Sequence, residues 1–325
     1  MQSINKILFI TLSNIGDVIL TLPCFDLLRN NFPDAKISIM TGPRPEMLFK
    51  NNPYVDKVII YDKRITWQNK RALVNSLRKE NFDLIIDLRN SMFPFLIGSK
   101  YRMPFTKKAP SFFHMRARHL YKIKYQISKI KNITQSQNQK SLYVSQEDKD
   151  YVKKLLEGNN MTDKDKIVLI GPGARSHIKR YTKEGFVNIC QSLIKDATIK
   201  IILVGDEDDS KVANEINKEV KTNIFNFCAK ISLLQLAYLI EKSVLLISCD
   251  SAIMHLASYL NKPVIAIFGP TNEVKYGPWS DNSVVARSNL KCVPCEVALC
   301  KHDHECMKNL EPQKIVEAAK KLLDL

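Results

Sequence analysis

The chain has 325 residues, 45% hydrophobic and 25% charged, a composition ordinary for a globular protein and a length sufficient for two domains. It contains no run of about eighteen uncharged apolar residues, so we expect no membrane-spanning segment. The formal net charge of +16 is unevenly placed, because residues 88–146 hold twelve basic residues and no acidic one. This segment predicts an anionic partner, such as a phosphorylated lipid, a membrane face or nucleic acid; a solvated loop is the alternative.

The first part of the chain alternates between strand-like and helix-like segments. We expect strands at residues 7–12, 37–40, 58–61 and 84–88, and helices at residues 17–31 and 67–79. The first strand is short and runs into Gly16 and Asp17 without a small-residue cleavage site, which indicates a buried strand and not a signal peptide. Regular alternation of this kind predicts a parallel sheet covered by helices on both faces.

The turn after the first strand, Ser13-Asn14-Ile15-Gly16-Asp17, lies where open α/β sheets bind ligands. It has a single glycine and lacks the G-x-G-x-x-G pattern, so a dinucleotide cradle is not expected. Asp17 either caps the first helix or points its carboxylate into the crevice, where Gly16 allows close approach of a ligand. In the crevice, the carboxylate could take a proton from a sugar hydroxyl as the bond to that hydroxyl forms.

The periodic pattern weakens between residue 92 and about residue 139, where three prolines interrupt it and residues 132–139 predict a loop. Basic and aromatic side chains are interleaved in this part of the chain: Arg89, Arg102, Lys107, Lys108, Arg116 and Arg118 among Phe93, Phe95, Phe105, Phe112, Phe113 and Tyr121. This mixture suits the headgroup region of a lipid, and it could also stack on single-stranded nucleic acid. No known nucleic-acid-binding module accompanies it, which favours the lipid.

A second alternating series follows a helix at residues 147–157 and a helix stop at Gly158. Its strands are expected at residues 167–170, 199–204, 224–227, 244–247 and 264–268, and its helices at residues 183–194, 210–219, 233–242 and 251–260. A last amphipathic helix, residues 312–323, could pack back on the N-terminal domain. The pattern predicts an α/β protein of two Rossmann-like domains, residues 1–158 and 159–325, each with a parallel sheet.

Asp250, Ser251 and Ala252 open the helix that follows the strand at residues 244–247. Asp250 or Ser251 is expected to cap this helix. The first amide groups of a helix have no internal partners and carry partial positive charge, so phosphates bind there. The turn therefore predicts a site for a phosphorylated ligand.

The loop after the strand at residues 167–170 brings cations to the same edge of the predicted sheet. Gly173 permits a tight turn, and Arg175, Lys179 and Arg180 follow it. A basic loop beside a helix N-terminus would clamp a diphosphate. A surface turn with solvated charges is the alternative, and we rank it lower because both loops follow strands of one sheet.

Three further positions follow strands of the second series. Glu207 lies where nucleotide-binding folds hold ribose hydroxyls, and Asp206 is the second candidate for this role. Alternatively, both residues only form the acidic first turn of the next helix. His255 lies one turn into the helix that Asp250 opens and either touches a phosphate or packs in the core. Thr271, after the strand at residues 264–268, could donate a hydrogen bond to a phosphate.

The cysteines, in a chain without an export signal, suggest a reducing compartment. Four of the eight occur singly in apolar surroundings and are expected in the core: Cys24, Cys190, Cys228 and Cys249. The others follow the spacing C-x2-C-x4-C-x5-C: Cys292, Cys295, Cys300 and Cys306. With His302 and His304 nearby, these would either hold a structural zinc ion or form a reduced thiol cluster in a surface loop.

At these residues the chain resembles the heptosyltransferase family of lipopolysaccharide core synthesis, which has the GT-B fold. The resemblance covers nearly the whole chain. It rests on Gly16-Asp17-Val18 with Thr21-Leu22-Pro23, on Lys179-Arg180-Tyr181, on Cys249-Asp250-Ser251 through His255-Leu256-Ala257, and on Phe268-Gly269-Pro270-Thr271. It implies two Rossmann-like domains that face each other across a cleft containing the active site.

The sequence departs from the family at two motifs. The family commonly has Asp-Thr-Gly where this chain has Asp250-Ser251-Ala252, and Trp-Pro where it has Tyr181-Thr182. Ser251 keeps a hydroxyl, whereas Ala252 narrows the turn. These changes leave the expected fold and reaction class intact and bear on which donor is used.

The resemblance implies inverting transfer of a sugar, usually heptose from ADP-heptose, onto a lipid-linked acceptor. Asp17 would be the general base, Lys179 would steady the diphosphate, and Ile231 would lie against the nucleotide base. The expected donor-binding residues are Gly173, Arg175, Lys179, Arg180, Glu207, Ile231, Asp250, Ser251, Ala252, His255 and Thr271. The expected acceptor-binding residues are Ser13, Asn14, Gly16, Arg89, Arg102, Arg116 and Arg118.

No cofactor and no catalytic metal are expected, because Lys179 and the helix end can stabilise a leaving diphosphate. We expect a cytoplasmic enzyme that touches the inner face of the membrane and does not bind nucleic acid. One alternative is a sugar-nucleotide epimerase of the same fold, which would not need the electropositive surface. The other is a nucleic-acid-binding protein, suggested by a pI near 9.4, which would not need Asp17.

Overall fold

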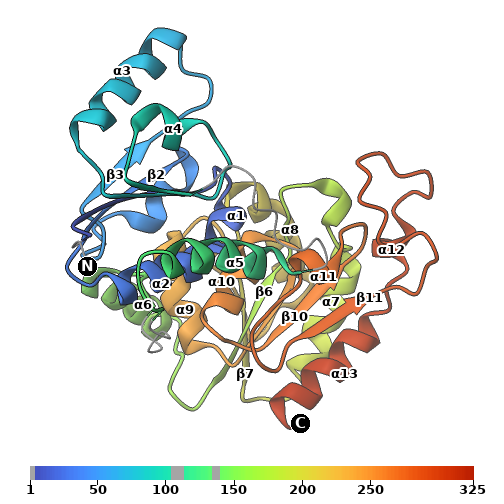
Figure 1. Cartoon of the computed structure of the whole chain (residues 1–325). Helices are drawn as coiled ribbons and strands as arrows, with labels where there is room; N and C mark the ends of the chain where they lie inside the picture. The colour runs from blue at the N-terminus through green and yellow to red at the C-terminus, as the bar shows by residue number, and fades with distance from the viewer. Residues whose placement is uncertain (1–3, 104–112, 134–139) are drawn as a thin grey trace. The chain divides into compact units, whose positions relative to one another are not determined.

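The computed structural model describes residues 4–103, 113–133 and 140–325, which form two compact units, Met1–Tyr143 and Val144–Leu325 (Figure 1). The boundary precedes the one predicted at residue 158, because helix α6 (Gln146–Glu157) packs on α9 (Leu233–Lys242) of the second unit. Asp148 accepts a hydrogen bond of 3.0 Å from the Gln235 side chain, which ties the start of α6 to α9.

The first unit is built on a parallel sheet of five strands in the order β3-β2-β1-β4-β5. The strands are β1 (Lys6–Ile10), β2 (Lys36–Thr41), β3 (Lys57–Ile60), β4 (Leu84–Asp87) and β5 (Tyr101–Arg102). In chain order, β2 and β3 extend the sheet from one side of β1, and β4 and β5 then extend it from the other side. Ligands of such sheets bind at this reversal, beside the carboxyl ends of β1 and β4.

The helices of the first unit are α1 (Ile15–Ile19), α2 (Leu22–Asn31), η1 (Arg44–Phe49), α3 (Trp67–Lys79), α4 (Phe93–Ile97) and α5 (Met115–Ser128). The single helix predicted at residues 17–31 is two helices, α1 and α2. Pro23 lies in the first turn of α2 and has no amide hydrogen to continue a helix from α1.

The part of the chain with a weak pattern contains α4, β5 and α5, none of which was predicted. The α5 helix was missed because cations occupy much of its surface and obscure its apolar face, on which Ile123 and Ile127 are fully buried. Several predicted features lie outside the described residues: Phe105, Lys107, Lys108, Phe112 and most of the predicted loop at residues 132–139.

The second unit contains a parallel sheet of six strands in the order β11-β10-β9-β6-β7-β8. The strands are β6 (Lys166–Gly171), β7 (Ile199–Leu203), β8 (Ile224–Asn226), β9 (Leu245–Cys249), β10 (Val264–Phe268) and β11 (Val284–Arg287). The edge strand β11 was not predicted. The reversal of strand order falls between β6 and β9, where Gly171 is paired with Ser248.

The other helices of the second unit are η2 (His177–Lys179), α7 (Lys183–Leu193), η3 (Glu207–Asp209), α8 (Ser210–Val220), α10 (Ala252–Tyr259), α11 (Glu273–Tyr276), α12 (Glu305–Lys308) and α13 (Pro312–Leu323). The last helix, α13, packs within the second unit, whereas the sequence had left open that it could pack on the N-terminal domain. Ile315, Val316 and Ala319 of α13 are buried in the core of the second unit, where the helix contacts α7 and strands β9 to β11.

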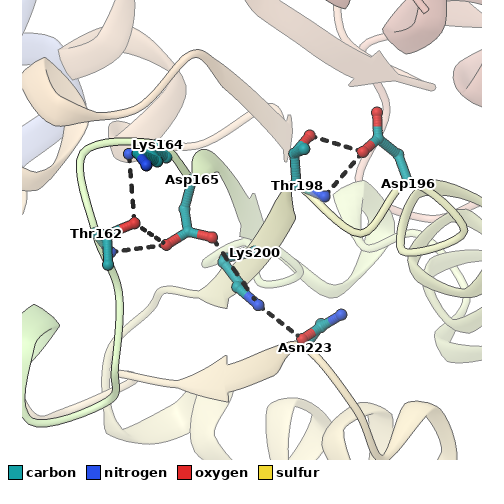
Figure 2. Close-up of polar contacts among 7 residues, drawn as sticks. All are labelled: Thr162, Lys164, Asp165, Asp196, Thr198, Lys200 and Asn223. Atoms are coloured by element: carbon teal, nitrogen blue, oxygen red, sulfur yellow. Dashed lines mark hydrogen bonds and ion pairs between the residues drawn. The ribbon is translucent and has the colours of Figure 1, made fainter.

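A polar network ties together the amino ends of the strands of the second unit, at the edge opposite the reversal loops (Figure 2). Asp165 accepts hydrogen bonds from the amide and hydroxyl of Thr162, at 2.7 and 2.9 Å, and lies 4.0 Å from the ammonium of Lys200. Lys200 also donates to Asn223 at 2.9 Å, which links β6, β7 and the turn before β8. We interpret this network as structural.

Replacing Asp165 with asparagine should lower the unfolding midpoint of the second unit at pH 7 by about 2–4 °C. The hydrogen bonds from Thr162, and secondarily the charge of Lys200, lower the pKa of Asp165. The stabilisation is therefore present above the pKa of an unfolded aspartate, near 3.9, and is lost as the pH falls through the lower folded pKa. Thermal unfolding should show the two proteins converging at acid pH. Asp163→Asn, at an exposed neighbour, serves as the control; equal midpoints at pH 7 would contradict a stabilising role.

Candidate active site

The loops at the reversal of the second sheet bring Lys179 and Asp250 together. Lys179 ends the short helix η2 after β6, and Asp250 follows β9. The Lys179 ammonium lies 2.7 Å from Asp250 Oδ2, across a sequence separation of 71 residues. The Asp250 side chain is 5% exposed and that of Lys179 28% exposed. A partly accessible cation is thus held in place by a nearly buried carboxylate.

The start of α10 is open to a ligand. Its N-cap residue is Ser251, in an extended conformation, and no side chain caps the helix. The Ser251 hydroxyl instead lies 3.1 Å from that of Ser248. The first amides of α10, beginning at Ala252, therefore keep the positive end of the helix dipole beside the Lys179–Asp250 pair. The capping expected of Asp250 or Ser251 does not occur.

The side chains of Cys249 and Tyr181 stabilise the turn that contains Asp250. The Cys249 thiol accepts a hydrogen bond of 3.4 Å from the amide of Tyr181, and burial raises the pKa of Cys249 to about 12. It therefore stays neutral beneath Asp250. The Tyr181 hydroxyl donates to the carbonyl of Leu310 at 2.6 Å, and this anchors the chain that follows Lys179.

Gly173 and Arg180 are fixed by the neighbouring loop after β7. A Cβ atom at Gly173 would overlap the carboxylate of Asp209, so this position requires glycine. Burial raises the pKa of Asp209, and the positive charge of Arg180 opposes that shift. Arg180 Nε also donates to the carbonyl of Ala174 at 2.8 Å. The sequence did not single out Asp209, whose carboxylate lies against Gly173 of the loop after β6.

Several other predicted donor-binding residues lie at this edge of the second sheet. The Glu207 side chain is exposed and has no hydrogen bond or ion pair among the described residues, whereas Asp206 caps η3. Ile231 is half-buried in the loop after β8, which reaches the β7 loop through a hydrogen bond of 3.1 Å from the Ala229 amide to the Gly205 carbonyl. The Glu207 carboxylate is therefore accessible, and Ile231 lies in a neighbouring loop.

Three more predicted donor-binding residues, Thr271, His255 and Arg175, differ in how exposed they are. Thr271 Oγ1 is buried and lacks a hydrogen-bond partner among the described residues. His255 is buried and its ring is stacked on Trp279 at 5.7 Å, which favours the packing role over phosphate contact. Arg175 is exposed in the loop after β6.

The reversal of the first sheet holds Asp17. It lies in the first turn of α1, and its Oδ2 accepts a hydrogen bond of 2.9 Å from the side chain of Asn14. Asp17 is half-buried and does not cap the helix, whose N-cap is Asn14. Gly16 precedes it in the same turn. Ser13 lies against Gly42, where a Cβ would come within 3.0 Å, so Gly42 lets this turn approach the end of β2.

The predicted acceptor-binding arginines occupy two places in the first unit. Arg89 follows β4 and lies 4.9 Å from the centre of the Tyr61 ring, and its Nη1 is buried without a hydrogen-bond partner in the described chain. Arg102 lies 4.9 Å from the centre of the Phe95 ring. Arg116 and Arg118 are half-buried in α5, and burial lowers the pKa of Arg116. Both are less exposed than expected for cations of a segment that faces a lipid headgroup.

Sequence reasoning missed a buried polar group beside these arginines. His119 of α5 is 4% exposed, and neither ring nitrogen has a hydrogen-bond partner among the described residues. Burial and the charges of Lys122 and Arg118 lower its pKa to about 4, so His119 is neutral at pH 7. Lys122 donates to Asn90 at 3.2 Å, which joins α5 to the loop after β4. A single histidine in a basic helix carries no sequence signal of this environment.

A model of "Glycosyltransferase family 9 (heptosyltransferase)" matches residues 70–305. The chain belongs to this family. It is 30% identical to "Lipooligosaccharide heptosyltransferase 2" of Campylobacter jejuni over 95% of both chains. The chain is thus a glycosyltransferase, and the identification does not favour the epimerase or the nucleic-acid-binding alternative.

Two solved structures share the fold of this glycosyltransferase. A family 9 glycosyltransferase of Veillonella parvula matches with a TM-score of 0.82 at 20% identity, covering 99% of this chain and 98% of the other. "E. coli ADP-heptose lps heptosyltransferase II" matches with a TM-score of 0.74 at 23% identity, covering 98% of each chain. The predicted GT-B fold class is confirmed.

The cysteines of the glycosyltransferase fall into the two predicted groups. Cys24, Cys190, Cys228 and Cys249 are buried in the core, as expected. The other four line one cavity of about 260 Å³ in the second unit: Cys292, Cys295, Cys300 and Cys306. Cys300 Sγ accepts hydrogen bonds from the amides of His302 and His304, at 3.4 and 3.3 Å. Within residues 4–103, 113–133 and 140–325, no three His, Cys, Asp or Glu side chains are arranged to hold a metal ion.

Proposed function

We propose that this family 9 glycosyltransferase moves a heptose from ADP-heptose onto a lipopolysaccharide-core acceptor, with inversion at the anomeric carbon. The observation that carries the proposal is the Lys179–Asp250 pair beside the uncapped start of α10, at the reversal of the second sheet. The relative from Campylobacter jejuni is named a lipooligosaccharide heptosyltransferase, and the solved Escherichia coli neighbour an ADP-heptose heptosyltransferase.

The second unit would bind the donor. The Lys179 ammonium and the first amides of α10 supply positive charge where the diphosphate gains negative charge as it leaves. Thr271 Oγ1, which lacks a partner among the described residues, would donate to the same group. The accessible Glu207 carboxylate would accept from ribose hydroxyls, and Ile231 would contact the nucleotide base. Asp250, besides holding Lys179, would accept from sugar hydroxyls.

Asp17 in the first unit would act as the general base. As the acceptor hydroxyl oxygen attacks the anomeric carbon, its proton passes to the Asp17 carboxylate, and the carbon–oxygen bond to the diphosphate breaks. Attack on the face opposite the leaving group inverts the configuration. The hydrogen bond of 2.9 Å from Asn14 leaves Asp17 Oδ1 available for that proton.

The acceptor would be an anionic glycolipid, held by Ser13, Asn14, Gly16 and the arginines of the first unit. Arg89 is the best supported of these, because its buried Nη1 lacks a hydrogen-bond partner in the described chain. Arg102, Arg116 and Arg118 would supply further charge. The described part of the chain has no helix with the length and apolar character needed to cross a membrane. We place the enzyme in the cytoplasm, in peripheral contact with the membrane that carries its acceptor.

A thermal-shift panel of ADP-, UDP-, GDP- and CDP-sugars tests the donor. ADP-sugars should raise the unfolding midpoint most, because only bound ligands stabilise the folded state. NMR of the product formed from ADP-heptose and a delipidated core acceptor would then give the anomeric configuration. Stabilisation by another nucleotide-sugar class alone would overturn the ADP assignment, and a retained configuration would overturn Asp17 as the base of a direct displacement.

A further inference from the structure

We propose that one surface of the first unit docks directly on an anionic lipid bilayer. We call it the α3–α4 surface, and its residues come from α3, from α4 with its N-cap residue, and from the segment that leads into β5 and includes Arg102 of that strand: Arg78, Met92, Phe95, Leu96, Lys100 and Arg102. The biological purpose of this docking rests on the proposed function, since a lipid-carried acceptor requires contact with a membrane. The physical basis of the docking does not depend on which sugar is transferred.

The α4 helix exposes large apolar side chains on one face. Met92 is 55% exposed, Phe95 41% and Leu96 39%, and their spacing of three and four residues places them on one side of a helix. The opposite side is anchored in the unit: Phe93 is buried and packs edge-on against Tyr61 at 4.9 Å. A clustered apolar face on an anchored helix marks a contact site more often than scattered exposed residues do.

Two arginines lie against residues of this apolar face, and a lysine lies nearby in the sequence. Arg102 lies 4.9 Å from the centre of the Phe95 ring, and Arg78 Nε of α3 donates to the Leu96 carbonyl at 2.6 Å. Lys100 lies 5.4 Å from the centre of the Tyr101 ring. Figure 1 shows α3 and α4 together at one end of the unit, where they pack on each other. Besides Arg78, residues 63–79 contain five basic residues and no acidic one.

This arrangement matches a bilayer better than a nucleic acid. Apolar side chains can enter the boundary between headgroups and acyl chains while the nearby cations meet lipid phosphates. Single-stranded nucleic acids are held chiefly by aromatic stacking, which the aliphatic Met92 and Leu96 cannot supply. The sequence had indicated a lipid for the whole basic and aromatic segment, which includes Phe95 and Arg102. Arg116 and Arg118 of that segment are half-buried in α5, whereas the exposed apolar residues lie at α4.

Cosedimentation of the full chain with phosphatidylcholine vesicles, with and without phosphatidylglycerol, tests the inference. The wild type should bind only the anionic vesicles and release them at high salt. Met92→Gln/Leu96→Gln and Arg78→Gln/Lys100→Gln should each lower the partition coefficient by roughly tenfold. The matched controls lie in the second unit, where Val274→Gln/Leu299→Gln and Lys195→Gln/Lys211→Gln should leave binding unchanged.

Failure of this inference can be told apart from failure of the proposed function. ADP affinity, measured by calorimetry, should be equal in the wild type and in all four variants, which also shows that they fold. Wild-type protein that binds ADP but ignores anionic vesicles would overturn the inference alone, as would α4 variants that bind vesicles as tightly as their controls. Tight binding of single-stranded RNA that the same variants abolish, without vesicle binding, would reassign the surface to nucleic acid.

Discussion

Replacing Asp17 with asparagine should lower kcat by about 10²–10⁴-fold while the affinity for the nucleotide-sugar stays at the wild-type value. Asparagine keeps the shape of the side chain and can still accept from Asn14, which donates to Asp17 at 2.9 Å. It cannot take a proton from the acceptor hydroxyl. The rate of ADP release in the presence of acceptor measures kcat, and calorimetry with ADP-heptose measures donor affinity.

Asp34→Asn is the matched control for this experiment. Asp34 is an exposed aspartate of the same unit, outside the reversal of the sheet, so its replacement should leave both quantities unchanged. Turnover retained by Asp17→Asn would remove Asp17 from the role of base. A parallel loss of donor affinity would instead assign the Asp17 carboxylate to donor binding.

Replacing Lys179 with methionine should weaken donor binding by about a hundredfold, since two effects act in the same direction. The diphosphate loses the ammonium that neutralises it. It also meets the carboxylate of Asp250, 2.7 Å from Lys179 Nζ in the wild type and almost buried, which is then left without its counter-ion. Calorimetric titration with ADP and with ADP-heptose measures the loss.

A second substitution separates the two effects. In Lys179→Met/Asp250→Asn the unpaired charge is gone, so ADP should bind several-fold more tightly than to Lys179→Met alone. Lys183→Met is the control, because Lys183 has an equally exposed side chain and pairs with Glu219 at 2.8 Å outside the reversal loops. If Lys179→Met binds ADP like this control, the diphosphate is held elsewhere.

The elements with a strong local signal could be predicted from the sequence. Helices Trp67–Lys79 and Leu233–Lys242 begin and end where the pattern indicates, because Thr66 and Ser232 cap them with side-chain hydrogen bonds. Central strands such as Val264–Phe268 are uninterrupted apolar runs buried on both faces. The alternation also predicted that the turns containing Asp17 and Asp250 follow strands at the carboxyl edge of parallel sheets, whereas the strand order that makes them reversal loops came from the structure.

Features that depend on tertiary contacts were not predictable. The Lys179–Asp250 ion pair joins loops that only the sheet brings together, so the sequence indicated two ligand-binding groups but not that each holds the other. That α6 belongs to the second unit depends on its contact with α9. No change in composition marks the end of the first unit at Tyr143. The burial of His119 and Arg116 depends on how α5 packs, which a cationic helix does not reveal.

The pairing of Lys179 with Asp250 also bears on selectivity. In the proposed donor site the Lys179 ammonium is already paired with the Asp250 carboxylate, so the pair itself has little net attraction for simple anions. Inorganic phosphate or pyrophosphate would have to compete with the Asp250 carboxylate for Lys179 and would bring further negative charge next to that carboxylate. A nucleotide-sugar carries hydroxyl donors beside its phosphates and can satisfy both partners at once. Abundant cellular phosphates would therefore be poor competitive inhibitors of this enzyme.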